Sequence, residues 1–325
     1  MKRKIIIDTD PGIDDAYAIL AALQNPDLDV LGITCVCGNR GIDKVVANAL
    51  KLTQLIHKDT PVFIGASTNL RNLRNNTMEP ITADKVHGSD GMGNVQLPYD
   101  EHNLSTEKAW DFIINTVSRY PQEVEILALG PLTNLALAVE KNLSAMKLLK
   151  NIYTMGGGIN RGNITKYAEY NYYFDDLAAQ SVFAALQDDI AFYMIGLDAT
   201  HSTRVDHNDL AFMRYEGGNV GQFISDITQV YGAMYYQNNG YLGAVIHDVV
   251  TYLYMIDPTI ATNDITNAYI QVLVDDIHRG QTVIEPQRKG HTTIAMHCDR
   301  KKTNQQMIKA LFPSKYERFM EVSAK

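Results

Sequence analysis

Short apolar runs alternate with longer amphipathic stretches along the first 200 residues. Three isoleucines fill positions 5–7, and further apolar runs lie at 30–34, 62–64, 124–129, 152–155 and 190–195. Helical patterns cover residues 13–24 and 41–57, and Ser105 is a predicted N-cap for a helix that ends at Arg119. Strands that alternate with helices favour βαβ units, and continuous apolar runs are typical of strands buried on both faces. The pattern predicts an α/β fold with an open, mainly parallel, Rossmann-like sheet flanked by helices.

No linker rich in proline or serine, and no repeat, divides the chain, so we predict a single domain over residues 1–325. The main interruptions are the connection from about Gly65 to Leu104 and a polar stretch at 156–171. Long connections in a compact domain tend to be functional or disordered. Open α/β sheets bind ligands beyond the carboxyl ends of their strands. We therefore expect one ligand-binding rim, formed by the loops after Ile7, Thr34, Leu129 and Met155.

The composition excludes several functional classes. Lys and Arg number 29 against 37 Asp and Glu, a formal net charge of −8, which argues against a broad nucleic-acid footprint. Three cysteines, Cys35, Cys37 and Cys298, are too few for a disulfide framework, and we expect reduced thiols. The start of the chain lacks the apolar region of a signal peptide, and no apolar stretch reaches membrane-spanning length. We expect a cytoplasmic protein with no nucleic-acid or membrane partner.

The strongest chemical signal is an acidic loop directly after the first strand. Four aspartates, Asp8, Asp10, Asp14 and Asp15, lie within eight residues, with no Lys or Arg between them. Like charges this close repel unless a cation neutralises them, and carboxylates suit Ca²⁺ or Mg²⁺. The Pro11-Gly12 turn should direct Asp10 and Asp15 to one point and leave Asp14 facing elsewhere. An acidic first helical turn that complements the helix dipole accounts for only one or two of the four.

Two families begin with such a loop. A strand followed by Asp-x-Asp also opens the haloacid-dehalogenase-like phosphatases, in which Asp8 would be the nucleophile and Mg²⁺ the metal. The downstream lysine and second acidic pair of those enzymes are not evident here. The segment from Asp8 to Ala16 instead resembles the signature of the inosine–uridine-preferring nucleoside hydrolase family. Further motifs follow in that family's order: Gly38-Asn39, residues 87–93, residues 129–134, residues 155–158, Asn163, residues 169–171 and His247-Asp248.

The resemblance extends to about residue 300 and implies a reaction and a cofactor. Members of the family hydrolyse the N-glycosidic bond of ribonucleosides, through a transition state like an oxocarbenium ion. The implied cofactor is Ca²⁺, which holds the water and the ribose hydroxyls. Its implied ligands are Asp10, Asp15, Asp248 and the backbone carbonyl of Leu129. Asp10 is then the general base for the water, and His247 protonates the leaving base. Asp8 helps to position the metal ligands without binding the ion itself.

The resemblance also implies which residues bind the substrate. Those expected at the ribose hydroxyls are Asp14, Asn39, Asn163, Glu169 and Asn171. Ordinary loop polarity is the alternative for each, most seriously for Asn163, because Gly162-Asn163 is also a turn dipeptide. His87 is a second candidate near the base, equally compatible with a structural role. Tyr235, which shares a helical face with Tyr231, is the first tyrosine to test as a contact to the base or a lid. Core packing of the helix is the alternative for most of these tyrosines.

Some properties stay open at this stage. Asp176-Leu177 replaces the family's Pro-Glu, which we interpret as a changed helix start. The presence of His247 favours the branch that includes broad and pyrimidine-preferring enzymes, without giving the preferred base. A homotetramer or homodimer is the family's usual assembly. Besides the phosphatase, a non-catalytic nucleoside-binding protein is the remaining alternative.

Overall fold

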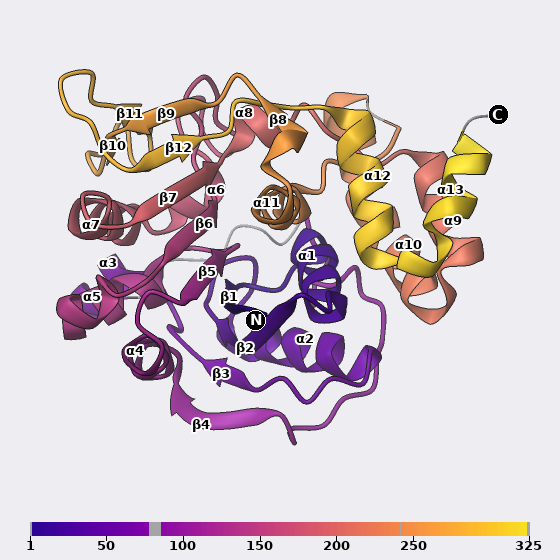
Figure 1. Ribbon diagram of the computed structural model, residues 1–325, viewed down its shortest axis with the longest axis horizontal. Coiled ribbons are helices and arrows are strands. Elements are labelled where there is room, and N and C mark those ends of the chain that lie inside the picture. Colours follow the sequence, from indigo (N-terminus) through magenta and orange to yellow (C-terminus); the bar gives the residue numbers. More distant parts are fainter. Residues whose placement is uncertain (1, 78–85, 241, 324–325) are drawn as a thin grey trace.

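The computed structural model describes residues 2–77, 86–240 and 242–323. In this part of the chain a central sheet has nine strands (Figure 1). Their order is β4 (Leu104–Lys108), β3 (Val62–Ile64), β2 (Leu28–Cys35), β1 (Arg3–Thr9), β5 (Val124–Ala128), β6 (Asn151–Met155), β7 (Ala191–Ile195), β12 (Thr292–Ile294) and β9 (Ile265–Ala268). Neighbouring strands are parallel, except that β9 runs antiparallel to β12. The predicted mainly parallel sheet is confirmed.

Strand β1 lies at the centre of the sheet, and its isoleucines are fully buried. Successive side chains of a strand point to opposite faces. Accordingly Ile5 and Ile7 belong to one apolar cluster and Ile6 to the other. Helices cover both faces (Figure 1): α1 (Ile13–Gln24), α2 (Ile42–Leu55) and α11 (His247–Ile256) on one, and α4 (Ala109–Arg119), α5 (Thr133–Met146) and α7 (Asp176–Leu186) on the other. The hydrophobic core therefore consists of two layers, one on each face of the sheet.

A second group of helices extends the layer of α1 and α11. It comprises α9 (His207–Glu216), α10 (Gly218–Asn239), α12 (Arg300–Leu311) and α13 (Tyr316–Ser323) (Figure 1). The smaller elements are α3 (Leu70–Asn75), α6 (Tyr170–Phe174), α8 (Leu197–Thr200), the 3₁₀ turns Pro258–Ile260 and Pro313–Lys315, and the antiparallel pairs β10 (Ile270–Val272) with β11 (Thr282–Ile284) and β8 (Ala261–Thr262) with β13 (His297–Cys298). Among the described helices, none combines the length and apolar composition needed to cross a bilayer.

The predicted N-cap at Ser105 is wrong. Residues 104–108 form the edge strand β4, which pairs with β3, and α4 begins only at Ala109. Pairing with β3 satisfies backbone groups that a helix would otherwise use, and polar side chains are tolerated on an edge strand. The connection from Gly65 to Leu104 contains α3 and the His87 loop, while residues 78–85 of it lie outside the described residues. The three cysteines are free thiols, all buried.

Candidate functional site

A cavity of about 490 Å³ opens at the carboxyl ends of the central strands. The loops after β1, β2, β5 and β6 all contribute to it, as the sheet rule predicts. The predicted site residues that line it are Asp14, Asn39, His87, Leu129, Asn163, Glu169, Asn171, Tyr235, His247 and Asp248. The structure therefore gathers residues from positions 14 to 248 at one site. Asp10 and Asp15 lie directly behind the cavity wall, in contact with Asn39.

Two helix N-termini bring three carboxylates together. Asp14 and Asp15 lie in the first turn of α1, and Asp248 lies in the first turn of α11. One oxygen from each side chain falls within a group whose members are at most 4.8 Å apart. Positive helix N-termini favour carboxylates at these positions. Asp14 does face differently from Asp15, because Asp14 lines the cavity whereas Asp15 accepts hydrogen bonds from Thr9 and Gly12 behind it. One oxygen of each still lies near Asp248.

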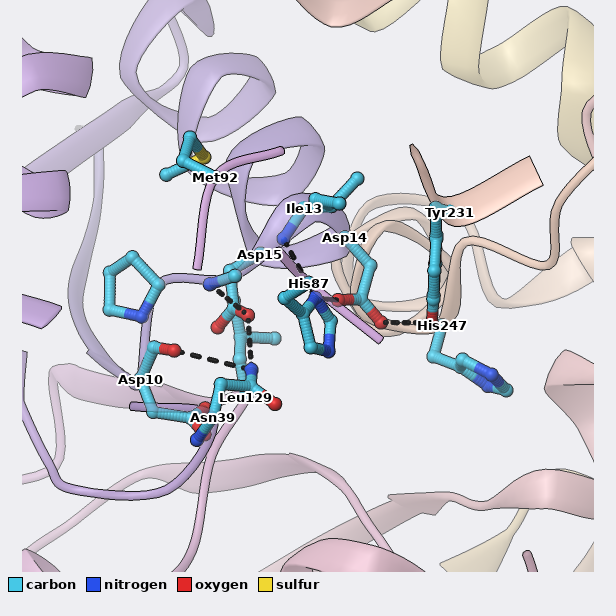
Figure 2. Close-up of polar contacts among 12 residues, drawn as sticks. Asp10, Ile13, Asp14, Asp15, Asn39, His87, Met92, Leu129, Tyr231 and His247 are labelled. Atoms are coloured by element: carbon cyan, nitrogen blue, oxygen red, sulfur yellow. Dashed lines mark hydrogen bonds and ion pairs between the residues drawn. The ribbon is translucent and has the colours of Figure 1, made fainter. Parts of the chain in front are cut away.

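Asp10 lies beside this group and is held by Asn39. Its Oδ2 accepts the backbone N–H of Asn39 at 2.6 Å, while Asn39 Nδ2 donates to the Asp10 carbonyl at 3.2 Å and to Asp15 Oδ2 at 3.3 Å (Figure 2). Asn39 thus links two of the predicted metal ligands. Burial, and then the charges of Asp14, Asp15 and Asp10, raises the pKa of Asp248 well above its usual range. All four carboxylates consequently share one electrostatic environment.

This arrangement fits a hard divalent cation. Within the described residues, the buried Oδ1 atoms of Asp10 and Asp14 have no hydrogen-bond partner. Burial and the neighbouring Asp15 raise the pKa of Asp14 to about 8, so the cluster opposes its own ionisation. Oxygen ligands of Ca²⁺ lie roughly 2.3–2.6 Å from the ion, so two of them can be up to about 5 Å apart. A divalent cation would satisfy the free oxygens and offset the excess negative charge.

Asp8 is buried away from the cavity. Its Oδ1 accepts hydrogen bonds from Thr34 Oγ1 at 2.6 Å and from Asn134 Nδ2 at 2.8 Å, and Asp8 does not line the cavity. Asn134 also accepts the Ala66 N–H through its Oδ1. Asp8 therefore connects β1 to neighbouring loops and is out of reach of a substrate, which argues against a nucleophilic role.

His247 is the first residue of α11 and is bonded at both ring nitrogens. Nδ1 lies 2.8 Å from Thr200 Oγ1, and Nε2 lies 2.9 Å from the Tyr235 hydroxyl. Burial lowers the pKa of His247 well below its usual value. Tyr235 itself is buried in α10 and lines the cavity. The helical face predicted to carry Tyr231 and Tyr235 does reach the site.

His87 is a neutral ring with a defined tautomer. The backbone N–H of Ile13, at the start of α1, donates to His87 Nδ1 at 3.2 Å (Figure 2). An accepting Nδ1 places the ring proton on Nε2. Burial, and secondarily the charge of Arg40, lowers the pKa of His87 to about 3. The 3.9 Å approach of Nδ1 to Asp14 Oδ1 is therefore not an ion pair, and Tyr231 is the side chain that donates to Asp14.

Glu169 and Asn171 anchor the loop that follows β6. Glu169 caps α6: its Oε1 accepts the Asn171 N–H at 2.7 Å, and its Oε2 accepts the N–H groups of Gly157 and Tyr172. Asn171 Nδ2 donates to the carbonyls of Leu129 at 2.8 Å and Met155 at 3.1 Å, which ties together the ends of β5 and β6. Both side chains combine a structural role with a position on the cavity wall. Asn163 is exposed on that wall.

Among the residues at the site that the sequence did not single out are Thr200, Arg161 and His201. Thr200 bonds His247, while Arg161 and His201 line the cavity, and the rings of His201 and His247 make an edge contact at 5.3 Å. Thr200 and His201 follow β7, whose loop was not included in the predicted rim. Applying the same sheet rule to the apolar run at 190–195 would have indicated them. Arg161 lies in the 156–171 stretch after Met155, which the predicted rim does include, but nothing in the sequence distinguished it from its neighbours.

Comparisons with known proteins show the family of this chain. The sequence model described as "Inosine-uridine preferring nucleoside hydrolase" matches residues 5–316. A probable uridine nucleosidase from Oryza sativa subsp. japonica is 36% identical over 286 residues, 87% of this chain and 85% of that protein. A solved plant nucleoside hydrolase superposes with a TM-score of 0.88 at 30% identity, covering 96% of this chain and 99% of its own.

A purine-preferring ribonucleoside hydrolase from Gardnerella vaginalis also superposes with a TM-score of 0.88, at 28% identity, covering 95% of this chain and 98% of its own. The similar proteins thus differ in the base they prefer. What they share is hydrolysis of an N-glycosidic bond, at a site built on the same fold. This chain belongs to the inosine–uridine-preferring nucleoside hydrolase family and is an enzyme that hydrolyses ribonucleosides.

Proposed function

We propose that the enzyme depends on Ca²⁺, held by Asp10, Asp15, Asp248 and the backbone carbonyl of Leu129. The observation that carries the proposal is the buried carboxylate cluster with unpartnered oxygens. Its ligand atoms are all oxygens, which suit Ca²⁺ better than zinc. When bound, the ion would orient water and the ribose hydroxyls and make the water more acidic.

Asp10 is the proposed general base. The backbone N–H of Asn39 orients its carboxylate through Oδ2, and Oδ1 makes no hydrogen bond within the described residues. As the water oxygen bonds to C1′ of the ribose, Asp10 takes its proton. The C1′–N bond breaks, and its electron pair leaves with the base. Positioned proton transfer of this kind contributes roughly 10²–10⁴-fold to the rate.

His247 is the proposed proton donor to the departing base. A neutral imidazole is too weak an acid to give up its single N–H, so His247 must hold a second proton when it donates, and it returns to the neutral ring as the base leaves. The Tyr235 hydroxyl, 2.9 Å from Nε2 and on the cavity wall, gives this proton a route to the substrate. Thr200 holds the other ring nitrogen and so orients the ring.

The remaining site residues are proposed to bind the nucleoside. Those assigned to the ribose hydroxyls are Asp14, Asn39, Asn163, Glu169 and Asn171, whose amide and carboxylate groups offer donors and acceptors for a sugar. His87 donates from its Nε2–H toward the base, because its Nδ1 is already occupied by Ile13. Tyr235 contacts the base beside His247.

Asp10→Asn tests the proposed base directly. We expect a loss of at least about 10³-fold in kcat for ribose release, because the amide cannot accept the proton. Asp27→Asn is the matched control, since Asp27 is exposed and distant from the cavity. Near-normal turnover by Asp10→Asn would refute this mechanism. Phosphate release from a nucleotide without release of the base would instead support the phosphatase reading.

The family resemblance further supports assembly as a homodimer or homotetramer. It also supports a cytoplasmic enzyme that acts in nucleoside salvage. Light scattering on the purified protein would give the assembly. A monomer that is fully active when diluted would exclude an obligatory oligomer.

A further inference from the structure

Asn48 joins two loops that the proposed mechanism uses. It is buried in α2, with 1% of its surface exposed. Its Nδ2 donates to the Pro11 carbonyl at 3.1 Å and to the Asp90 carbonyl at 2.9 Å. Pro11 belongs to the acidic loop after β1, and Asp90 belongs to residues 87–94, which we call the His87 loop. An amide nitrogen carries two N–H groups, so one side chain serves both carbonyls.

Lys51, one turn later in α2, fixes the orientation of this amide. Its Nζ donates to Asn48 Oδ1 at 3.3 Å. If the amide were rotated by half a turn, its oxygen would face the two loop carbonyls, and its N–H groups would face an ammonium that can only donate. Both contacts would then be unfavourable. The surroundings therefore select the observed orientation, with Nδ2 toward the two loops.

The His87 loop is held against α2 by a row of donors. Three consecutive carbonyls of the loop accept side chains spaced four residues apart: Gly88 from Arg40, Ser89 from Lys44 at 2.7 Å, and Asp90 from Asn48. At Gly91 the backbone has φ +85°, and a Cβ would lie 3.1 Å from Asn48 Nδ2. Glycine is therefore required where the loop comes closest to Asn48. Within this row, Asn48 also reaches the acidic loop.

The contact that depends on this junction is the hydrogen bond between Ile13 and His87. The Ile13 N–H donates to His87 Nδ1 at 3.2 Å, at the long end of the usual range (Figure 2). Both partners lie within three residues of the carbonyls that Asn48 holds. A Cβ at Gly12 would lie 2.8 Å from His87 Nδ1, so the two loops are in direct contact here. A small displacement of either loop would break the bond that orients the ring.

We propose that Asn48 is a positioning residue for the reaction: by tying the acidic loop to the His87 loop, it keeps the Nε2–H of His87 where it can donate to the leaving base. This inference rests on the proposed function, in which the acidic loop holds the ion and His87 contacts the base. Asn48 does not line the cavity, so it acts through His87 and not by contact with the nucleoside. Misplacing a group by about 1 Å can cost about 10²-fold in rate.

Asn48→Asp tests the bridge, because it keeps the shape of the side chain and sets a carboxylate oxygen against both carbonyls. We expect kcat for ribose release to fall about 10- to 100-fold. The change in KM should be smaller, because the hydrogen bond from His87 strengthens as the base takes up the electron pair of the C1′–N bond.

Asn103→Asp is the matched control. Asn103 is also buried, and its Nδ2 donates to the Lys58 carbonyl at 2.8 Å and to Thr53 Oγ1 at 3.3 Å, near the C-terminal end of α2. It does not line the cavity. This variant loses a comparable pair of buried hydrogen bonds, so it should be less stable than wild type and have the same kcat.

Combining Asn48→Asp with His87→Gln separates positioning from a general loss of structure. If Asn48 acts through His87, the double variant should have the kcat of His87→Gln alone, because the same contribution cannot be lost twice. Nitrogen-15 NMR of the histidine rings gives a second readout. The His87 Nδ1 signal should move in Asn48→Asp toward that of a ring without the bond from Ile13, and it should stay in place in Asn103→Asp.

Two results would overturn the inference. One is that Asn48→Asp and His87→Gln lower kcat independently, so that their effects multiply in the double variant. The other is an unmoved His87 signal in folded Asn48→Asp that binds Ca²⁺ more weakly, which would mean that Asn48 acts on the acidic loop alone.

Lys51→Met keeps the inference testable if Asn48→Asp does not fold. It lets the amide rotate, so it should move the same His87 signal and lower kcat by a smaller factor, and no change in either would equally overturn the inference. If wild type released ribose from no nucleoside, the proposed function itself would fail. That failure is distinct, because the NMR signal reports the position of His87 without any turnover.

Discussion

At the scale of single residues, Asp10 depends on the absence of two side chains. A Cβ at Gly130 would lie 2.5 Å from Asp10 Oδ1, and a Cβ at Gly38 would collide with Oδ2. The motifs that contain these glycines, noted first as matches to a family, therefore have a steric reason. Each lets the backbone of a neighbouring strand end approach the carboxylate closely.

Gly130→Ala should displace Asp10 and reduce kcat by about 10²-fold, because misplacing a reacting group by about 1 Å can cost this much. Gly232→Ala is the control: its Cβ would meet nothing closer than 3.8 Å, within α10. There alanine favours the helix, and activity should be unchanged. Ribose release and thermal unfolding of both variants check this. Equal kcat in the two variants would contradict the steric account of Asp10.

His87 also leads to a prediction at this scale. Its pKa of about 3 and its accepting Nδ1 mean that the ring stays neutral, with the proton on Nε2, from pH 8 down to pH 5. Nitrogen-15 NMR of the histidine rings, with His87→Gln to assign the signal, measures both properties. A His87 signal that titrates near pH 6.5, or that shows a protonated Nδ1, would exclude the neutral donor that we propose.

At the scale of elements, three helices converge on His247. Helix α11 begins with it, α8 supplies Thr200, and α10 supplies Tyr235. The N-termini of α1 and α11 also bring their carboxylates together. The site is thus an outcome of helix packing as much as of the loops at the ends of the strands.

Thr200→Val should lower kcat for ribose release by about 10-fold with little change in KM, since a buried ring nitrogen left unpaired loses its orientation at a cost of about 1–3 kcal/mol. Tyr235→Phe should have at least this effect, because it also removes the proton route. Thr228→Val, which removes the hydroxyl bonded to Tyr17 at 2.7 Å, is the control and should affect stability alone. A normal kcat in both Thr200→Val and Tyr235→Phe would mean that His247 needs neither partner.

The same scale shows what could be predicted from the sequence. Buried parallel strands read clearly as apolar runs, so the sheet and most of its rim were predictable. The edge strand β4 was not, because its residues are polar and only pairing with β3 makes them a strand. Likewise, nothing local indicates that α10 brings Tyr231 to Asp14, 217 positions away, since that contact depends on tertiary packing.

At the scale of the whole molecule, a buried ion-pair cluster lies at the end of the sheet opposite the cavity. Glu125 in β5 is buried and accepts hydrogen bonds from Arg3 Nη2 at 2.7 Å, Arg3 Nε at 3.0 Å and Lys150 Nζ at 3.1 Å. Arg3 also donates to the Met255 carbonyl at the end of α11. These contacts join β1, β5 and α11 far from the cavity.

Glu125→Gln should destabilise the fold by about 1–3 kcal/mol at pH 7 without changing kcat. Burial would raise the pKa of Glu125, but Arg3 and Lys150 together outweigh it, so the pKa lies below the ordinary 4.5. The stabilisation is therefore present above pH 4.5 and lost as the pH falls through the lower, folded-state value. Chemical denaturation should show wild type and variant converging below pH 4.5, and a gap that persisted or widened there would contradict this. Glu123→Gln, at an exposed pair with Lys4, should have little effect.

The measurement that tests the account most directly is ribose release from inosine, uridine, cytidine and adenosine, before and after exhaustive chelation. We predict that chelation abolishes ribose release and that added Ca²⁺ restores it. Metal analysis should show Ca²⁺ bound to the wild type and bound more weakly by Asp15→Asn and Asp248→Asn. Full activity in enzyme shown to be free of metal, or no ribose from any of the four nucleosides, would contradict the account.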